Sequence, residues 1–385
     1  VDVDLKSAVG TTTVDFELAA LAGAADNVTV TIKGTNSTTL AFTDDNPLQT
    51  TVLETVTIDS LSVANTLADL QTTGVATSKL VVTGDKKLTI SAALDAEILT
   101  VDASGSTGGL VLSVAPGYAN ATIHGSDGAD TLTAAPTGLA NLSLGAGNDV
   151  VDFDATLNYL DVVDGGDGTD TLTMSTGFTN VSVLGGVSNV EVIKLDGAGT
   201  TITLEENIGA TTFDFTNDDA QTLNLNDGYT NATNVKITGD GVGTDTIVNT
   251  ANVELTVTGN VEDFDGSGSL TITGGAVGTD KLVMLNSVDN GAAVLATGIT
   301  GVDHITISDY TAGADPTLTI GAYTLSATYA KALTIDASSL DAGVGEAAEV
   351  FTLAGANSVT RMDVTGGAAG DVLAGGTLAD TIDGG

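Results

Sequence analysis

Three aspartates, Asp130, Asp149 and Asp170, each follow a glycine-rich turn and precede a short run of Thr or Val with a large apolar residue. Carboxylate oxygens are ligands that hard cations such as calcium prefer. Glycine adopts backbone angles with positive φ, which lets carbonyl oxygens crowd toward an ion. The chemistry that these residues predict is calcium binding.

The turns share one nine-residue pattern, GGxGxDxUx, in which U is a large apolar residue. The stretch GGDGTDTLT (165–173) fits at every defined position. GSDGADTLT (125–133) departs only at Ser126, and LGAGNDVVD (144–152) departs only at Leu144. Each nonapeptide predicts a turn followed by a short strand, and two of them form one coil of about 18 residues.

The three aspartates are separated by 19 and 21 residues, which is close to one coil per step. We therefore expect the turns to stack along one edge, with two calcium ions, one between the Asp130 and Asp149 turns and one between the Asp149 and Asp170 turns. The opposite edge, near TGLAN (137–141) and NYLDV (158–162), lacks the motif, and we expect no ion there.

Other copies of the motif are less regular. Asp371 and Asp380 lie nine residues apart, which is the rhythm of tandem nonapeptides. GDGVGTDTIV (239–248) and GGAVGTDKLVM (274–284) contain one extra residue before the last Gly-x-Asp of the motif, and metal binding there stays open. The candidate metal ligands are Asp127, Asp130, Gly145, Gly147, Asn148, Asp149, Gly165, Asp167, Asp170, Asp245, Asp263, Asp265, Asp280, Asp371 and Asp380.

Asp263 and Asp265 belong to DFDGSGSL (263–270), which resembles the first eight positions of an EF-hand loop. Gly274 stands where an EF-hand has its twelfth-position glutamate. We therefore do not expect an EF-hand, and a calcium loop between strands is the alternative.

Short alternating runs of Thr with Val, Ile or Leu predict an all-β chain, for example VTVTIKG (28–34) and SLTITGG (269–275). Weak helix-like patches occur at 16–25 and 63–70. LTVDAS (99–104) returns as LTIDAS (333–338), each time ahead of Gly-Asp turns. Such repeats favour a right-handed parallel β-solenoid, or β-roll, with β-sandwich-like modules as the alternative in places.

The sequence suggests four segments. They are an N-terminal β-rich module (1–75), a β-roll segment (76–175), a solenoid or sandwich array with degenerate Gly-Asp turns (176–325), and a second β-roll segment (326–385). Because ADTIDGG ends partway through a nonapeptide, we expect the last repeat to be truncated. The first residues lack the basic and apolar regions of a signal peptide.

Composition narrows the function classes. The 385 residues include 50 acidic and 10 basic ones, for a net charge of −40, which disfavours nucleic acids and anionic membranes as partners. A hydrophobic content of 42% argues against disorder. Cysteine is absent, which excludes disulfides and thiolate chemistry. No apolar run is long enough for a membrane-spanning helix.

Catalysis is not expected. The chain has no HExxH or GxSxG motif, and its two histidines, His124 and His304, lie beside predicted turns or strands. Pairs of carboxylates arise by chance among so many acidic residues, so they do not indicate a glycosidase. We therefore assign no catalytic residue and no organic cofactor.

The run from SKLVVTGDKKLTIS to LSLGAGNDVV (78–151) resembles the C-terminal region of RTX surface-layer (S-layer) proteins of Gram-negative bacteria, and 325–385 repeats its order. Related blocks occur in type I-secreted RTX adhesins. The resemblance implies a secreted protein that leaves through a type I system, binds several calcium ions and self-assembles into a lattice at the bacterial cell surface. Cell-envelope polysaccharide is a candidate anchoring partner.

Two alternatives stay open. The chain could be a calcium-stiffened stalk segment of an adhesin, or the secretion and stability tail of an RTX enzyme. A lattice protein would form two-dimensional order with calcium, whereas a stalk would stay monomeric.

Overall fold

The chain forms two compact units, Val1–Ser175 with Ser182–Val192 and Thr176–Val181 with Ile193–Gly385. The computed structural model describes residues 2–6, 10–16, 26–34, 37–44, 52–72, 75, 77–114, 120–134, 138–153, 157–175, 184–197, 199–204, 208–216, 220–237, 245–251, 253–260, 264, 270–275, 280–286, 292–295, 299–309, 316–320, 332–340, 350–354 and 361–385.

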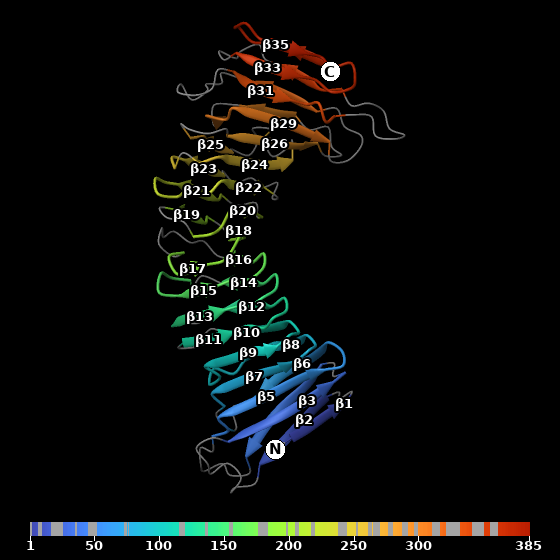
Figure 1. Cartoon of the computed structure of the whole chain (residues 1–385), viewed down its shortest axis with the longest axis vertical. Helices are drawn as coiled ribbons and strands as arrows, with labels where there is room; N and C mark the ends of the chain where they lie inside the picture. Colours follow the sequence, from blue (N-terminus) through green and yellow to red (C-terminus); the bar gives the residue numbers. More distant parts are fainter. Residues whose placement is uncertain are drawn as a thin grey trace. The chain divides into compact units, whose positions relative to one another are not determined.

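The strands form because apolar and polar residues alternate. In β3 and β5, for instance, every second side chain is buried, and the β-branched residues between them suit the pleat. Within each unit the described strands pair in parallel with strands one coil away, so consecutive coils of a unit stack on one another (Figure 1). The described residues contain no α-helix and no helix long and apolar enough to cross a membrane.

The first unit has two such sheets. One contains β1 (Asp2–Lys6), β3 (Asn27–Lys33), β5 (Thr55–Leu61), β7 (Lys79–Gly84), β9 (Thr100–Ser106), β11 (Asn120–His124), β13 (Leu139–Ser143), β15 (Val162–Asp164) and β17 (Val187–Ser188), in that order. The other contains β2 (Gly10–Phe16), β4 (Thr38–Asp44), β6 (Asn65–Gln71), β8 (Leu88–Leu94), β10 (Leu110–Val114), β12 (Thr131–Ala134), β14 (Val150–Phe153) and β16 (Thr171–Met174).

The described residues of the second unit form three runs of parallel strands. The longest contains β20 (Thr212–Phe215), β22 (Thr233–Ile237), β24 (Leu255–Asn260), β26 (Lys281–Asn286), β29 (His304–Asp309), β31 (Leu333–Asp336), β33 (Met362–Thr365) and β35 (Thr381–Asp383), and β18 (Val192–Leu195) pairs with β20. The second contains β19 (Thr201–Leu204), β21 (Thr222–Leu225), β23 (Thr246–Asn249), β25 (Thr271–Thr273) and β28 (Ile299–Thr300). The third contains β27 (Ala292–Leu295), β30 (Thr317–Ile320), β32 (Thr352–Ala354) and β34 (Val372–Ala374).

The core consists of apolar residues stacked coil over coil. In the first unit one inward column contains Val28, Val56, Leu80, Val101, Ile123, Leu142, Val163 and Val187, each the register partner of the next. All of these side chains are buried. Burying one such side chain contributes about 1.5–3 kcal/mol, so the column is a main source of stability.

The predicted all-β parallel β-solenoid is confirmed, and its geometry is consistent with a right-handed β-roll. Between residues 199 and 309 the described strands pair in parallel with strands one coil away. Parallel pairing between successive coils is typical of a solenoid.

Candidate cation-binding turns

The three motif turns of the first unit lie directly over one another. Ala146 forms a parallel bridge with Asp167, and its N–H donates to the carbonyl oxygen of Ser126 at 3.1 Å. The N–H of Asp167 donates to the carbonyl oxygen of Gly145 at 2.9 Å. The turns therefore stack along one edge, as their spacing predicts.

The motif aspartates form a ladder of hydrogen bonds along this stack. The backbone N–H of Asp130 donates to Oδ1 of Asp149 at 2.7 Å, and the N–H of Asp149 donates to Oδ1 of Asp170 at 2.8 Å. The ladder continues below to the N–H of Leu110, which donates to Asp130 at 2.6 Å, and above to Glu191, which accepts from the N–H of Asp170 at 2.8 Å. One oxygen of each aspartate thus satisfies a backbone donor in the preceding coil.

The second oxygen divides the turns into two classes. Oδ2 of Asp149 and Oδ2 of Asp170 are buried and have no hydrogen-bond partner, and both residues are 0% exposed. The glycines of these two turns have left-handed backbones, with φ of 103° and 133° at Gly145 and Gly147 and 95° and 149° at Gly166 and Gly168. A buried carboxylate oxygen without a donor is costly unless a cation or proton occupies it.

In the second class the carboxylate closes its own turn. Oδ2 of Asp130 accepts from the N–H of Ser126 at 2.8 Å, and the same contact joins Asp371 to Gly367 at 2.6 Å and Asp380 to Gly376 at 2.7 Å. Their Oδ1 atoms accept from the N–H of Leu110, Phe351 and Met362 in the preceding coil. Both oxygens of these aspartates therefore have protein donors.

Of the looser copies, the one at 274–284 is built like the second class, and residues 239–244 of the other lie outside the described residues. Asp280 accepts from the N–H of Gly275 through Oδ2 and from the N–H of Leu255 through Oδ1. Asp245 accepts from the N–H of Gln221 at 2.9 Å. Asp263 and Asp265 lie outside the described residues.

Burial raises the pKa of all three motif aspartates of the stack. Burial, together with the neighbouring charges of Asp130 and Asp170, raises the pKa of Asp149 to about 6, against the hydrogen bond from the Asp130 N–H, which lowers it. Burial also raises the pKa of Asp170, assisted by Glu191 and Asp164. In both cases the cause is a carboxylate held away from water and close to other anions, and a divalent cation would offset both effects.

The remaining predicted residues surround the two turns. Asp127, Asn148 and Asp167 are exposed, and Oδ1 of Asn148 accepts from the N–H of Thr169 at 3.0 Å. Gly165 packs against its own aspartate, since a Cβ there would lie 2.6 Å from Oδ2 of Asp170. The close packing explains the first glycine of the motif.

Two further carboxylates, which the nine-residue motif does not identify, accept backbone hydrogen bonds in the same coils. Asp161, on the edge that lacks the motif, is buried and accepts from the N–H of Ala140 and the N–H of Asn158, both at 2.8 Å. Glu191 ends the aspartate ladder. Neither residue follows a glycine pair, so only the register of the coils could have indicated them.

The Asp149 and Asp170 turns fit a calcium ion in the chemistry of their donors. Each supplies one buried carboxylate oxygen without a partner, beside left-handed glycines. Within the described part of the chain, no group of three or more His, Asp or Glu side chains is placed to hold a metal ion. Calcium takes 6–8 oxygen ligands, and backbone carbonyls are among them.

The fold and these turns define the chain as a parallel β-solenoid with stacked Gly-Asp turns. No family model, no curated protein and no solved structure matches it.

Proposed function

We propose that the chain is an extracellular structural protein of a bacterial surface that binds calcium at its Gly-Asp turns and self-assembles with calcium into an S-layer-like lattice. The observation that carries the proposal is the pair of buried, unpartnered Oδ2 atoms of Asp149 and Asp170 in stacked turns with left-handed glycines. The two atoms belong to the turns between which the spacing places one of its two expected ions, and Asp130, which would share the other ion with Asp149, has donors on both oxygens.

The charge of the chain supports the need for cations. Seven ion pairs occur among the described residues, and they involve Lys6, Lys33, Lys79, Lys86, Lys194, Lys281 and Arg361. The 10 basic residues of the chain face 50 acidic ones, so lysine and arginine cannot neutralise the surface. Divalent ions would reduce this self-repulsion and allow acidic subunits to approach one another.

The energies are consistent with folding that depends on external calcium. Extracellular calcium modules bind with dissociation constants of about 10⁻⁴–10⁻³ M, far above cytosolic free calcium. At an ion concentration ten times the dissociation constant, each site stabilises the folded chain by about 1.4 kcal/mol. Two sites then contribute about 2.8 kcal/mol, a large share of the stability of a marginally stable domain.

Calcium titration of the purified chain tests the binding step. We expect thermal unfolding followed by circular dichroism to shift upward with millimolar calcium, and the shift to disappear after chelation and with magnesium at the same ionic strength. An unfolding midpoint that does not respond to calcium would remove the basis of the proposal.

Assembly needs a separate measurement, because a stalk segment of a type I-secreted RTX adhesin is the alternative. The continuous parallel pairing of β1 to β17 would also suit a stiff stalk. Electron microscopy with and without calcium distinguishes the two. Two-dimensional order supports the lattice, whereas monomers that bind calcium and do not associate support the stalk. An RTX enzyme tail has less support, since the sequence lacks the hydrolase motifs.

A further inference from the structure

One corner position of the first unit changes its chemistry along the stack. Register and backbone hydrogen bonds align Ser60, Gly84, Ser106, Ser126, Gly145 and Gly166, which we call the corner column. Three of the first four members are serines, and the three glycines, Gly84, Gly145 and Gly166, all have positive φ. Hydroxyl groups therefore predominate at one end of the corner column, and the other end contains left-handed glycines alone.

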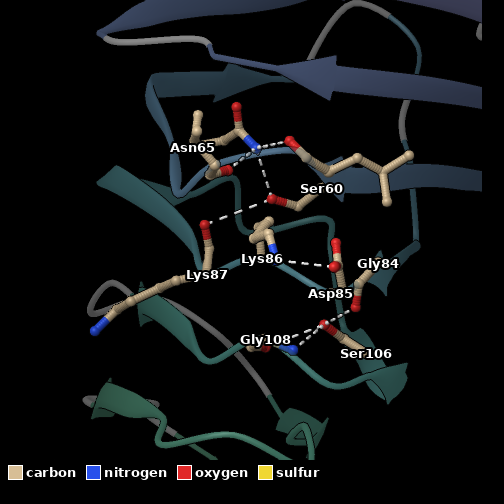
Figure 2. Close-up of polar contacts among 10 residues, drawn as sticks. Ser60, Asn65, Gly84, Asp85, Lys86, Lys87, Ser106 and Gly108 are labelled. Atoms are coloured by element: carbon tan, nitrogen blue, oxygen red, sulfur yellow. Dashed lines mark hydrogen bonds and ion pairs between the residues drawn. The ribbon is translucent and has the colours of Figure 1, made fainter.

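The serines close their turns with their own side chains. Oγ of Ser106 lies 3.1 Å from the carbonyl oxygen of Gly84 and 3.0 Å from that of Gly108, and it accepts from the N–H of Gly108 at 3.3 Å (Figure 2). Oγ of Ser60 accepts from the side-chain amide of Asn65 at 2.9 Å. Polar groups of the protein thus satisfy these corners without an ion.

Asn65 adds a second closure in the same region. Its Nδ2 donates to the carbonyl oxygen of Val63 at 2.8 Å, and its Oδ1 accepts from the N–H of Gly34 at 2.7 Å. The side chain is buried and points to Ser60, as Figure 2 shows. Amide and hydroxyl groups therefore connect successive coils below the motif turns.

Ser126 is the last serine of the corner column and the residue directly before its left-handed glycines Gly145 and Gly166. Its N–H donates to Oδ2 of Asp130 at 2.8 Å, and its hydroxyl lies 2.7 Å from Oδ1. The hydroxyl also accepts from the N–H of Gly128 at 3.2 Å. Asp130 therefore occupies the motif position and has donors on both oxygens, from Ser126 and from Leu110.

In the first unit, the glycines at the equivalent positions do not close their turns in this way. Gly367 and Gly376 of the second unit, which do not have positive φ, donate their N–H groups to Oδ2 of Asp371 and Asp380. Gly145 and Gly166 stand four residues before Asp149 and Asp170, as Ser126 stands four before Asp130. Both have positive φ, and the Oδ2 atoms of their aspartates have no hydrogen-bond partner. A serine side chain is strained at such φ values, whereas glycine is not.

We propose that Ser126 keeps the Asp130 turn free of cations and so marks the boundary within the first unit between coils that fold without calcium and coils that need it. The inference rests on the proposed calcium binding at Asp149 and Asp170. Coils up to residue 134 then form a metal-independent base, and the turns from 144 onward order on that base when calcium binds. The hydroxyl and N–H of Ser126 contact the carboxylate oxygens of Asp130, whereas an ion contacts the unpartnered oxygens of Asp149 and Asp170.

Ser126→Gly tests the role of the serine, because it converts 125–133 into GGDGADTLT, a full match to the motif. Equilibrium dialysis against calcium chloride, with bound metal measured by atomic absorption, should show one more calcium per chain than the unsubstituted protein. Ser106→Gly is the matched control, since it removes a hydroxyl of the same column but has Leu110 at the aspartate position. It should bind the unsubstituted number. An unchanged number in folded Ser126→Gly, or an equal gain in Ser106→Gly, would overturn the assignment.

Hydrogen exchange of the unsubstituted chain tests the boundary without a variant. Chelation should speed exchange in 144–175 by about tenfold, the effect of losing a site held at ten times its dissociation constant. Exchange in 77–114 should not change. Loss of protection in both segments would overturn the metal-independent base while leaving calcium binding intact. No response to calcium in either segment would instead contradict the proposed function itself.

Discussion

Asp170 accepts the backbone N–H of Asp149 through Oδ1 at 2.8 Å, while its buried Oδ2 has no partner. Oδ1 therefore belongs to the ladder of hydrogen bonds between coils, and Oδ2 is the oxygen that a cation can bind. Asp170→Asn should preserve an acceptor for the ladder and remove the charge that calcium needs. We expect the calcium-dependent gain in unfolding free energy to fall by about 1.4 kcal/mol at ten times the dissociation constant, as measured by chemical denaturation with and without calcium.

Asp371→Asn is the control for that prediction. Both oxygens of Asp371 accept backbone N–H groups, so an amide there places an N–H₂ group against one of those donors. The variant should lose about 1–3 kcal/mol without calcium. Its gain from calcium should match that of the unsubstituted chain. A reduced gain would mean that this turn also binds an ion.

The end of the ladder gives a second prediction. Oε2 of Glu191 accepts the N–H of Asp170 at 2.8 Å. Glu191→Ala leaves that donor without an acceptor and should cost about 1–3 kcal/mol in unfolding free energy. Glu191→Gln retains an acceptor oxygen and should cost less. Equal losses in the two variants would show that the charge of Glu191, rather than the hydrogen bond, is what matters.

The sequence predicted the solenoid because its signals are local. Alternation of apolar residues defines strands, and the 19- and 21-residue steps between motif aspartates define coils. The weak helix-like patch at 63–70 is not helical, since Asn65–Gln71 is strand β6 with a register shift against β4, and residues 17–25 of the other patch lie outside the described residues. The apolar residues of 63–70 suit either period, and pairing with neighbouring coils decided between them.

The candidate site was only partly predictable. The motif identifies Asp130, Asp149 and Asp170 alike, yet only the latter two have an unpartnered oxygen. The difference depends on the φ value of the residue four positions earlier and on a hydrogen bond within the turn, from the N–H of Ser126 to Oδ2 of Asp130. Neither quantity can be read from one nonapeptide. Asp161 carries no local motif, so its capping of Ala140 became visible only in the folded register.

A third prediction concerns the left-handed glycines. A Cβ at Gly166 would lie 2.0 Å from the carbonyl oxygen of Gly145, and φ there is 95°. Gly166→Ala should destabilise the fold by at least about 1–3 kcal/mol from backbone strain. Gly370→Ala is the matched control in another Gly-Asp turn, because a Cβ there meets nothing within 4 Å. Its unfolding midpoint should move little, and equal losses in both variants would contradict the steric argument.

The last prediction is a pH dependence at Asp280. Burial, together with the charge of Asp303, raises the pKa of Asp280 to about 6, against three hydrogen bonds that lower it. Because the folded-state pKa lies above the ordinary value of 3.8, the folded chain binds this proton more tightly than the unfolded chain. Its contribution to stability is therefore fully present below about pH 4 and is lost as pH rises through about 6. Carbon-13 NMR of the Asp280 carboxyl, with Asp280→Asn to assign the signal, should show a midpoint near 6. A midpoint near 4 would mean that the three hydrogen bonds compensate fully for burial.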